Sequence, residues 1–219
     1  MTSTVPAGVK TVEKGFVPLL GVLISGQGSN LQALVAAIDE GKLRAQIAVV
    51  ISNIPDAGGL AIARGAGIES VVIPHGAQRS REIYDRALVT ALRERGVQLV
   101  CLAGFMRLLG PAFCGSFPTA VLNIHPSLLP SFPGTNAQRQ AIDYGVKVSG
   151  ATVHLVTPEL DGGPIVSQRA VPVFDDDTAE TLAARVRTVE HEIYPEAVER
   201  ILWEPWEIAG RRVVFSGRS

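Results

Sequence analysis

Between residues 17 and 104, short apolar runs alternate with longer segments in which apolar residues recur at helical spacing. The short runs are hydrophobic throughout rather than at every second position, which is typical of strands covered on both faces. Parallel strands joined by helices produce this pattern, so we expect a doubly wound, Rossmann-like α/β fold. The expected strands are 17–25, 45–53, 69–74 and 97–104, and the expected helices are 29–41, 57–67 and 80–96.

The second half of the chain predicts three more strands, at 119–125, 148–157 and 164–173. The connection between the last two, around LDGGP, is too short for a crossover helix, so these strands should pair antiparallel. The predicted fold is therefore a mostly parallel sheet of about seven strands with an antiparallel strand in its C-terminal half.

Two further helices and a terminal hairpin are expected. The helices cover 136–144 and 178–202, with a kink at Pro195, and the hairpin covers 206–215. We expect one domain after a flexible N-terminal tail. The divisions are the tail (1–16), the single domain (17–219), its first half (17–118), its second half (119–203) and a C-terminal hairpin or tail (204–219).

The charge balance restricts the partners that can be argued from composition. The chain has 20 basic and 21 acidic residues, so nothing indicates a nucleic-acid footprint or a polybasic membrane patch. Its two cysteines have no metal-site or disulfide spacing, and no apolar stretch is long enough to span a membrane. We expect a cytoplasmic protein that binds small molecules and exists as a monomer or homodimer, without nucleic-acid or membrane partners.

A glycine-rich turn, SGQGSN, lies between the first expected strand and the first expected helix. Glycines let the backbone approach an anion, and the N–H groups of Ser29 and Asn30 would point at it from the start of the helix. The spacing fits neither a dinucleotide fingerprint nor a nucleoside-triphosphate loop, so a phosphate monoester is favoured. The alternative is a plain tight turn in which Ser29 or Asn30 caps the helix.

The segment LNIHPSLLP places Asn123 and His125 two residues apart at a strand end, so both side chains point to the same side. Asp161, in the later ELDGGP turn, could join them if the fold brings it close. A carboxylate beside an imidazole favours the charged ring, and an imidazolium beside an amide offers two donors to an oxyanion. The alternatives are a core histidine with one bonded neighbour and an ordinary turn aspartate.

Other chemistries find little support. The chain has four histidines, and none forms an H-x-x-x-H pair, so no metal site is expected. A G-x-S-x-G nucleophile elbow is also absent. An enzyme with this sequence would transfer a group directly to the nucleophile of its substrate.

Together, SGQGSNLQAL, AGFMRLLGPAF, LNIHPSLLPSFPG, GATVHLVTPELDGGPI and RVRTVEHEIYP resemble the glycinamide ribonucleotide formyltransferase family of de novo purine synthesis. The motifs occur from about Leu19 to Tyr194, in the order and at the spacings of the family. This resemblance implies transfer of a formyl group from the co-substrate 10-formyltetrahydrofolate to the glycine amine of the phosphoribosyl glycinamide, through a tetrahedral intermediate. Two departures are Gln27, where the family often has Asn, and FPGTNAQRQA, which lacks histidines found in bacterial members.

The same resemblance implies residue roles. In catalysis, His125 would stabilise and protonate the collapsing intermediate, Asn123 would bind its oxyanion, and Asp161 would favour the charged histidine and relay protons through water. His154 would support them. The implied ribonucleotide-binding residues are Gly28, Ser29, Asn30, Leu31, Gln32, Arg187, Thr188, Val189 and Glu190. The implied folate-binding residues are Arg81, Met106, Arg107, Leu108, Leu109, Asn123, Thr157, Pro158, Glu159, Leu160 and Asp161.

Local sequence supports simpler interpretations of two of these sets. Without the family, Glu190 would be interpreted as an exposed helix glutamate and MRLL as the end of a core strand. Two other enzymes of the wider group are alternatives: a transfer-RNA formyltransferase, expected to carry an extra C-terminal domain, and a formyltetrahydrofolate hydrolase, expected to carry an extra N-terminal domain. A non-catalytic phosphosugar-binding protein is the alternative outside the enzymes.

Overall fold

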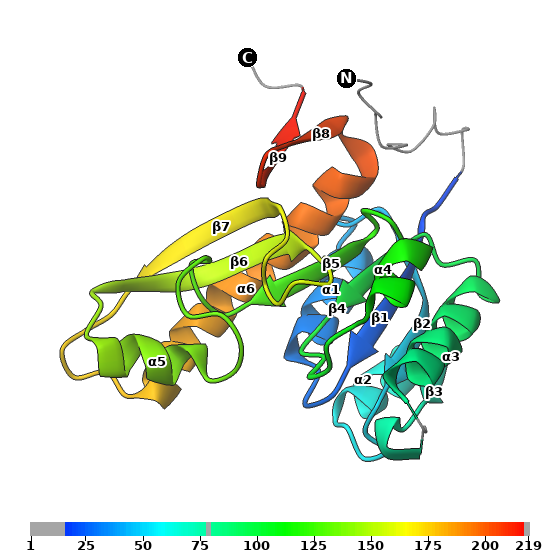
Figure 1. Cartoon of the computed structure of the whole chain (residues 1–219), viewed down its shortest axis with the longest axis horizontal. Coiled ribbons are helices and arrows are strands. Elements are labelled where there is room, and N and C mark those ends of the chain that lie inside the picture. The colour runs from blue at the N-terminus through cyan, green and yellow to red at the C-terminus, as the bar shows by residue number, and fades with distance from the viewer. Residues whose placement is uncertain (1–15, 78–79, 217–219) are drawn as a thin grey trace.

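A single nine-stranded sheet runs through the computed structural model, which describes residues 16–77 and 80–216 (Figure 1). The predicted tail, except for Phe16, lies outside the described residues. The strand order is β3-β2-β1-β4-β5-β6-β7-β9-β8. The strands are β1 (Leu19–Ile24), β2 (Gln46–Ser52), β3 (Ser70–Val72), β4 (Leu99–Leu102), β5 (Val121–His125), β6 (Val148–Leu155), β7 (Ile165–Pro172), β8 (Trp206–Ala209) and β9 (Arg212–Phe215).

The first five strands are parallel, and β6 pairs antiparallel with both β5 and β7. The predicted mixed sheet is therefore confirmed for the seven strands expected in the body of the sheet. The strand count was too low, because the terminal hairpin β8–β9 joins the same sheet through a short parallel pairing of β9 with β7. This hairpin stands at the top of Figure 1.

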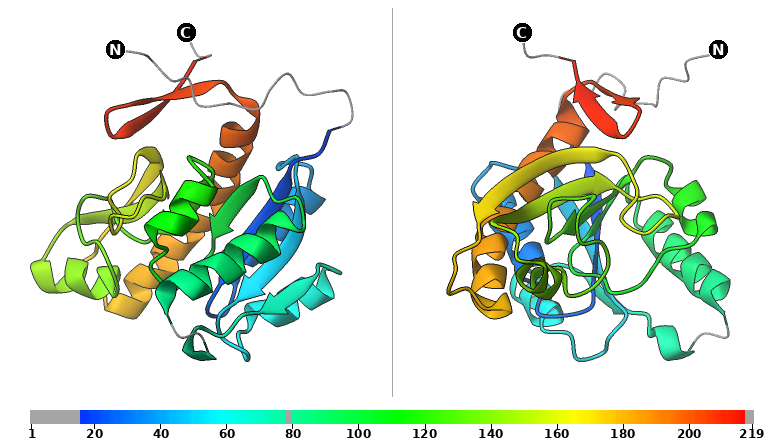
Figure 2. Two further views of the ribbon diagram at one scale, coloured as in Figure 1. Left: turned by 45° about the vertical axis from the view of Figure 1, so that its right-hand side comes forward. Right: turned by 60° about the vertical axis from the view of Figure 1, so that its left-hand side comes forward.

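The helices form a layer on each side of the sheet. They are α1 (Ser29–Asp39), α2 (Gly59–Gly65), α3 (Arg81–Arg93), α4 (Pro111–Ser116), α5 (Ala137–Tyr144) and α6 (Ala179–Trp203), with a 3-10 turn at His75–Ala77. Buried residues of α1, α2 and α6 share one core cluster with the sheet, and those of α3 and α4 share another (Figures 1 and 2). The doubly wound arrangement of the first half is thus confirmed.

Two short elements were missed: α4 and the 3-10 turn. Helix α4 has six residues, too few to display an amphipathic repeat, and its Pro111 lies in the first turn, where a missing N–H is tolerated. Helix α6 begins at Ala179, directly after the cap residue Thr178, whose hydroxyl accepts a hydrogen bond from Thr181 N at 3.3 Å. It continues through Pro195 as one helix of 25 residues.

Candidate active site

Strand β5 carries two of the predicted catalytic residues at its carboxyl end. Its alternation places Leu122 and Ile124 in the core cluster shared with α1 and α6. Asn123 and His125 consequently point to the opposite side of the sheet. Strand β6 lies beside β5, with His154 in register with Asn123. Two neighbouring strands therefore present three polar side chains near the carboxyl end of β5.

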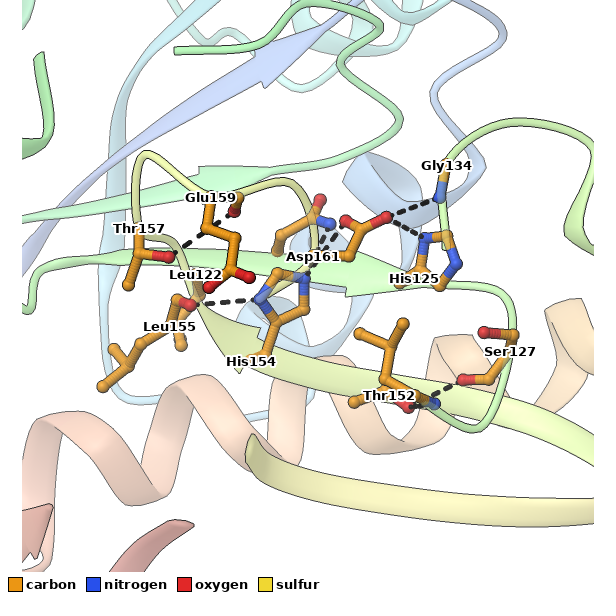
Figure 3. Close-up of polar contacts among 12 residues, drawn as sticks. Leu122, His125, Ser127, Gly134, Thr152, His154, Leu155, Thr157, Glu159 and Asp161 are labelled. Atoms are coloured by element: carbon orange, nitrogen blue, oxygen red, sulfur yellow. Dashed lines mark hydrogen bonds and ion pairs between the residues drawn. The ribbon is translucent and has the colours of Figure 1, made fainter. Parts of the chain in front are cut away.

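Asp161 reaches these residues from the turn between β6 and β7, as Figure 3 shows. Its Oδ2 lies 3.5 Å from His125 Nδ1, and its Oδ1 lies 3.7 Å from His154 Nε2. The backbone N–H of Gly134 donates to Asp161 Oδ2 at 2.7 Å, which holds the carboxylate between the two rings. The structure thus brings the predicted trio together, with Asp161 and His125 side chains only 9% and 6% exposed.

Both nitrogens of the His125 ring face oxygen acceptors. Nδ1 faces the Asp161 carboxylate, and Nε2 lies 2.9 Å from the carbonyl oxygen of Phe132. A neutral imidazole has one N–H and can donate to only one of them, whereas the doubly protonated ring can donate to both. Asp161 and Phe132 therefore fix the orientation of the His125 ring through both of its nitrogens.

His154 has a different environment, because its two hydrogen bonds suit a neutral ring. Its Nδ1 lies 3.0 Å from Leu155 O, and its Nε2 lies 3.1 Å from Asn123 Nδ2. A ring protonated at Nδ1 donates to the carbonyl and accepts from the amide. Burial lowers the pKa of His154, and the Asp161 charge only partly offsets this effect. His154 thereby orients the Asn123 amide, whose second N–H makes no hydrogen bond to another described residue.

The glycine-rich turn connects β1 to α1. Gly28 occupies the N-cap position with a left-handed φ of 81°, so neither Ser29 nor Asn30 caps the helix, and the capping alternative is wrong. A Cβ added at Gly28 would lie 2.5 Å from Gly59 Cα, which shows how closely the turn packs on α2. The side chain of Leu31 is fully buried in the core, so this residue can offer a ligand only its backbone.

Glu190 of α6 lies against the start of α1. It is 8% exposed, which overturns the interpretation as an exposed helix residue. Asn30 Nδ2 donates to Glu190 Oε2 at 3.3 Å, while Asn30 Oδ1 is buried with no hydrogen-bond partner among the described residues. Burial raises the pKa of Glu190 to about 7, against the opposing effects of the Asn30 hydrogen bond and the Arg187 charge. Arg187 and Thr188 are exposed, and Val189 packs partly against the core.

The segment after β4 exposes apolar side chains at the carboxyl end of the parallel strands. Strand β4 ends at Leu102, and Met106 and Leu108 are 69% and 51% exposed, so interpreting MRLL as the end of a core strand is wrong. Leu109 alone turns inward and packs in the core with α3. Leu160, in the turn that carries Asp161, is 49% exposed.

Polar groups flank these apolar side chains. Arg81 and Arg107 are exposed, and both lie near enough to the buried Asp85 to lower its pKa, although burial raises that pKa overall. Pro158 and Glu159 are exposed in the loop before Asp161, and the Thr157 hydroxyl lies 3.5 Å from Glu159 O. Exposed apolar side chains beside two guanidinium groups suit a flat ring with an anionic tail.

Sequence reasoning missed the backbone groups that hold the catalytic side chains, namely Phe132 O and Gly134 N–H. The turn residues Pro133 and Gly134 signal a bend there, but nothing in the sequence indicates its partners. Within the described part of the chain, no group of three or more His, Cys, Asp or Glu side chains could hold a metal ion. None of the described helices is long and apolar enough to cross a membrane.

Comparison with known proteins identifies the class. The formyl transferase family model matches residues 20–198, so the chain belongs to the formyl transferase family of enzymes. It is 49% identical, over 80% of its length and 82% of the relative, to phosphoribosylglycinamide formyltransferase of Escherichia coli.

Solved structures agree with this assignment. Glycinamide ribonucleotide transformylase 1 from Symbiobacterium toebii has a TM-score of 0.90 and 48% identity, covering 96% of this chain and 99% of that one. A formyltetrahydrofolate deformylase from Pseudomonas syringae has a TM-score of 0.85 but 28% identity, covering 92% of this chain and 66% of that one. The resemblance drawn from the motifs is therefore confirmed.

Proposed function

We propose that this enzyme transfers the formyl group of 10-formyltetrahydrofolate to the glycine amine of phosphoribosylglycinamide, in purine (IMP) biosynthesis. The observation that carries the proposal is the approach of Asp161 to His125, with Asn123 on the same strand. The names and identities of the Escherichia coli and Symbiobacterium toebii relatives support the choice of acceptor.

In this reaction the amine forms a bond to the formyl carbon, the bond from that carbon to the folate nitrogen breaks, and the amine proton passes to the departing nitrogen. Asn123 stabilises the oxygen anion through the N–H that His154 leaves available. His125, oriented by the contact of its Nδ1 with Asp161, donates from Nε2 toward the same centre in place of its contact with Phe132 O. Asp161 also relays protons through water.

The same proposal assigns the binding groups. Backbone N–H groups at the start of α1, from Gly28 to Leu31, bind the phosphate, aided by the positive end of the helix dipole, while Gln32, whose N–H donates to Gly28 O, contributes its side chain. Glu190 accepts hydrogen bonds from the ribose hydroxyls, and residues 187–189 flank it. The folate lies against Met106 and Leu108, with Leu109 behind them.

The remaining folate contacts come from both sides of that segment. Arg81 or Arg107 meets the carboxylates of the tail, and residues 157–161 close the other side. We further propose one domain over residues 17–219, a monomer or homodimer in the cytoplasm, and a reaction that uses small-molecule substrates without a metal, nucleic acid or membrane.

The alternatives fit less well. The deformylase structure is 28% identical to this chain, whereas the Symbiobacterium transformylase is 48% identical, and this difference favours transfer over hydrolysis. A non-catalytic phosphosugar-binding protein would have no need for the buried contacts that join Asp161 to two histidines.

The test is a steady-state assay that follows the absorbance of the folate product with purified protein. We expect turnover only when 10-formyltetrahydrofolate and phosphoribosylglycinamide are both present. Folate consumption without the ribonucleotide would indicate a hydrolase. Ribonucleotide binding without any turnover would support the phosphosugar-binding alternative.

A further inference from the structure

Ser25 directly follows β1 and is the first residue of the glycine-rich turn, and its polar groups form hydrogen bonds with two neighbouring segments. Its N–H donates to Gly104 O at 3.2 Å. Its Oγ accepts from the backbone N–H of Met106 at 2.8 Å and donates to Asn53 Oδ1 at 2.6 Å. Since a hydroxyl has one proton to donate, these contacts fix the direction in which the Ser25 hydroxyl points.

Asn53 is itself held in one orientation. It is 3% exposed, directly follows β2, and its backbone N–H donates to Ile24 O at 3.4 Å. Its Nδ2 lies 3.3 Å from His75 Nδ1, so its Oδ1 faces Ser25. Leaving this buried amide without a partner would be unfavourable, so the contact of Asn53 with His75 helps to maintain its hydrogen bond with Ser25.

These contacts connect the two proposed binding segments. The ribonucleotide loop, residues 25–32, begins with Ser25 and binds the ribonucleotide from Gly28 onward, and the folate segment, residues 106–109, begins at Met106. Strands β2, β1 and β4 are adjacent and parallel, so Asn53, Ser25 and Met106 emerge at the same carboxyl edge. Ser25 therefore links the folate segment, through its hydroxyl, to the glycine-rich turn of which it is part.

We propose that Ser25 is a positioning residue that sets the placement of the ribonucleotide loop relative to the folate segment and thereby couples the binding of the two substrates. This inference rests on the proposed function. When a substrate binds one segment, it favours the arrangement in which Ser25 Oγ accepts from Met106 N–H. That arrangement also positions the other segment for its own substrate. Each substrate then raises the affinity for the other by the same factor.

The test measures that factor with a pair of ligands that do not react together. Calorimetry gives the Kd of phosphoribosylglycinamide with and without saturating tetrahydrofolate, for wild type and for Ser25→Ala. We expect tetrahydrofolate to tighten ribonucleotide binding about fivefold or more in wild type and to have almost no effect in Ser25→Ala. We also expect kcat of the variant to fall by about tenfold or more, because misplacement of a substrate by a fraction of an ångström slows transfer.

Two variants serve as controls. Ser116→Ala removes an exposed hydroxyl that donates to Ala112 O, outside both segments, and should keep the coupling and the rate of wild type. Ser25→Thr retains a hydroxyl and should restore most of the coupling lost in Ser25→Ala, which also provides a test if the alanine variant fails to fold.

The outcomes separate the two claims. Wild-type turnover combined with unchanged coupling in a folded Ser25→Ala would overturn the role of Ser25 and leave the proposed function intact. An equal loss of affinity for both ligands, with the coupling factor unchanged, would also overturn it, because that pattern indicates a general structural role. A wild-type protein that neither binds the ribonucleotide nor forms product would contradict the proposed function itself.

Discussion

At the scale of single residues, charge and hydrogen bonding at Asp161 determine what the neighbouring side chains can do. Its carboxylate touches His125 on one side and His154 on the other, and Gly134 N–H fixes it in place. His125 has an oxygen acceptor at each ring nitrogen, whereas burial lowers the pKa of His154. The two rings can therefore serve different functions although they share one carboxylate.

Asp161→Asn keeps an oxygen that can accept from Gly134 N–H but removes the charge beside His125. We expect kcat to fall by about two or more orders of magnitude with little change in Tm, since general acid–base and oxyanion contributions have this size. His125→Ala should have a similar effect on kcat. Steady-state kinetics and thermal unfolding of the purified variants check both.

Asp143→Asn is the matched control for this experiment. Its side chain is 64% exposed on α5 and lies 3.9 Å from Arg139, whereas the Asp161 side chain is 9% exposed. We expect wild-type kinetics from it. Wild-type rates in Asp161→Asn would show that the roles assigned to Asp161 and His125 are wrong.

Glu190 makes the stability depend on pH. Its pKa is about 7 in the folded protein, above the ordinary value of 4.5, so the folded state binds its proton more tightly than the unfolded state. The contribution of Glu190 to stability is fully present below about pH 4.5 and is lost as the pH rises through 7. The loss is on the order of 3 kcal/mol in the free energy of unfolding.

Glu190→Gln should remove this contribution. Denaturant unfolding at a series of pH values should show the variant gaining stability relative to wild type between about pH 5 and pH 8. A constant difference between the two proteins across that range would contradict the raised pKa. Glu190→Ala should in addition weaken ribonucleotide binding with a smaller effect on kcat, as expected of a group that contacts the ribose rather than the reacting atoms.

At the scale of elements, the turn between β1 and α1 depends on Gly28. Gly28→Ala would place a Cβ 2.5 Å from Gly59 Cα at a left-handed φ, so it should destabilise the fold by about 1–3 kcal/mol and weaken ribonucleotide binding. Gly26→Ala is the control in the same turn, because its Cβ would meet nothing within 4 Å. Equal stability of the two variants in chemical denaturation would refute this account of the turn.

Helix α6 is attached to the sheet by the hydroxyl of Tyr194, which is fully buried and lies 2.9 Å from Leu102 O and 3.2 Å from Leu122 O. Tyr194→Phe removes these contacts, so we expect a loss of about 1–3 kcal/mol in the free energy of unfolding. Tyr144→Phe changes a side chain that is 80% exposed and should have almost no effect. Equal denaturation midpoints for the two variants would show that the buried hydroxyl contributes nothing.

The elements that the sequence predicted best are those with long periodic patterns. The apolar runs of β1, β2 and β4 and the amphipathic pattern of α3 are each sufficient to identify the element. Helix α4 and the 3-10 turn were missed because each is shorter than two helical turns. The hairpin at 206–215 was expected, but its membership of the main sheet depends on a tertiary pairing with β7 that no local pattern reveals.

At the scale of the whole molecule, the candidate site forms where the strands end. The sequence identified Asn123 and His125 as a pair because they lie two apart on one strand. The approach of Asp161 to this pair, with Asp161 Oδ2 3.5 Å from His125 Nδ1, depends on the β6–β7 turn folding back over β5. The burial of Glu190 likewise depends on the packing of α6 on α1, which is why the local pattern indicated an exposed residue.

The central claim is that this protein moves a formyl group to phosphoribosylglycinamide rather than releasing it. The most direct measurement is mass spectrometry of the products after incubation with the ribonucleotide and 10-formyltetrahydrofolate carrying a labelled formyl carbon. The account predicts that the label appears in the ribonucleotide product in wild type and that almost none appears with Asp161→Asn. Label recovered mainly as formate, or an equal yield from the variant, would contradict it.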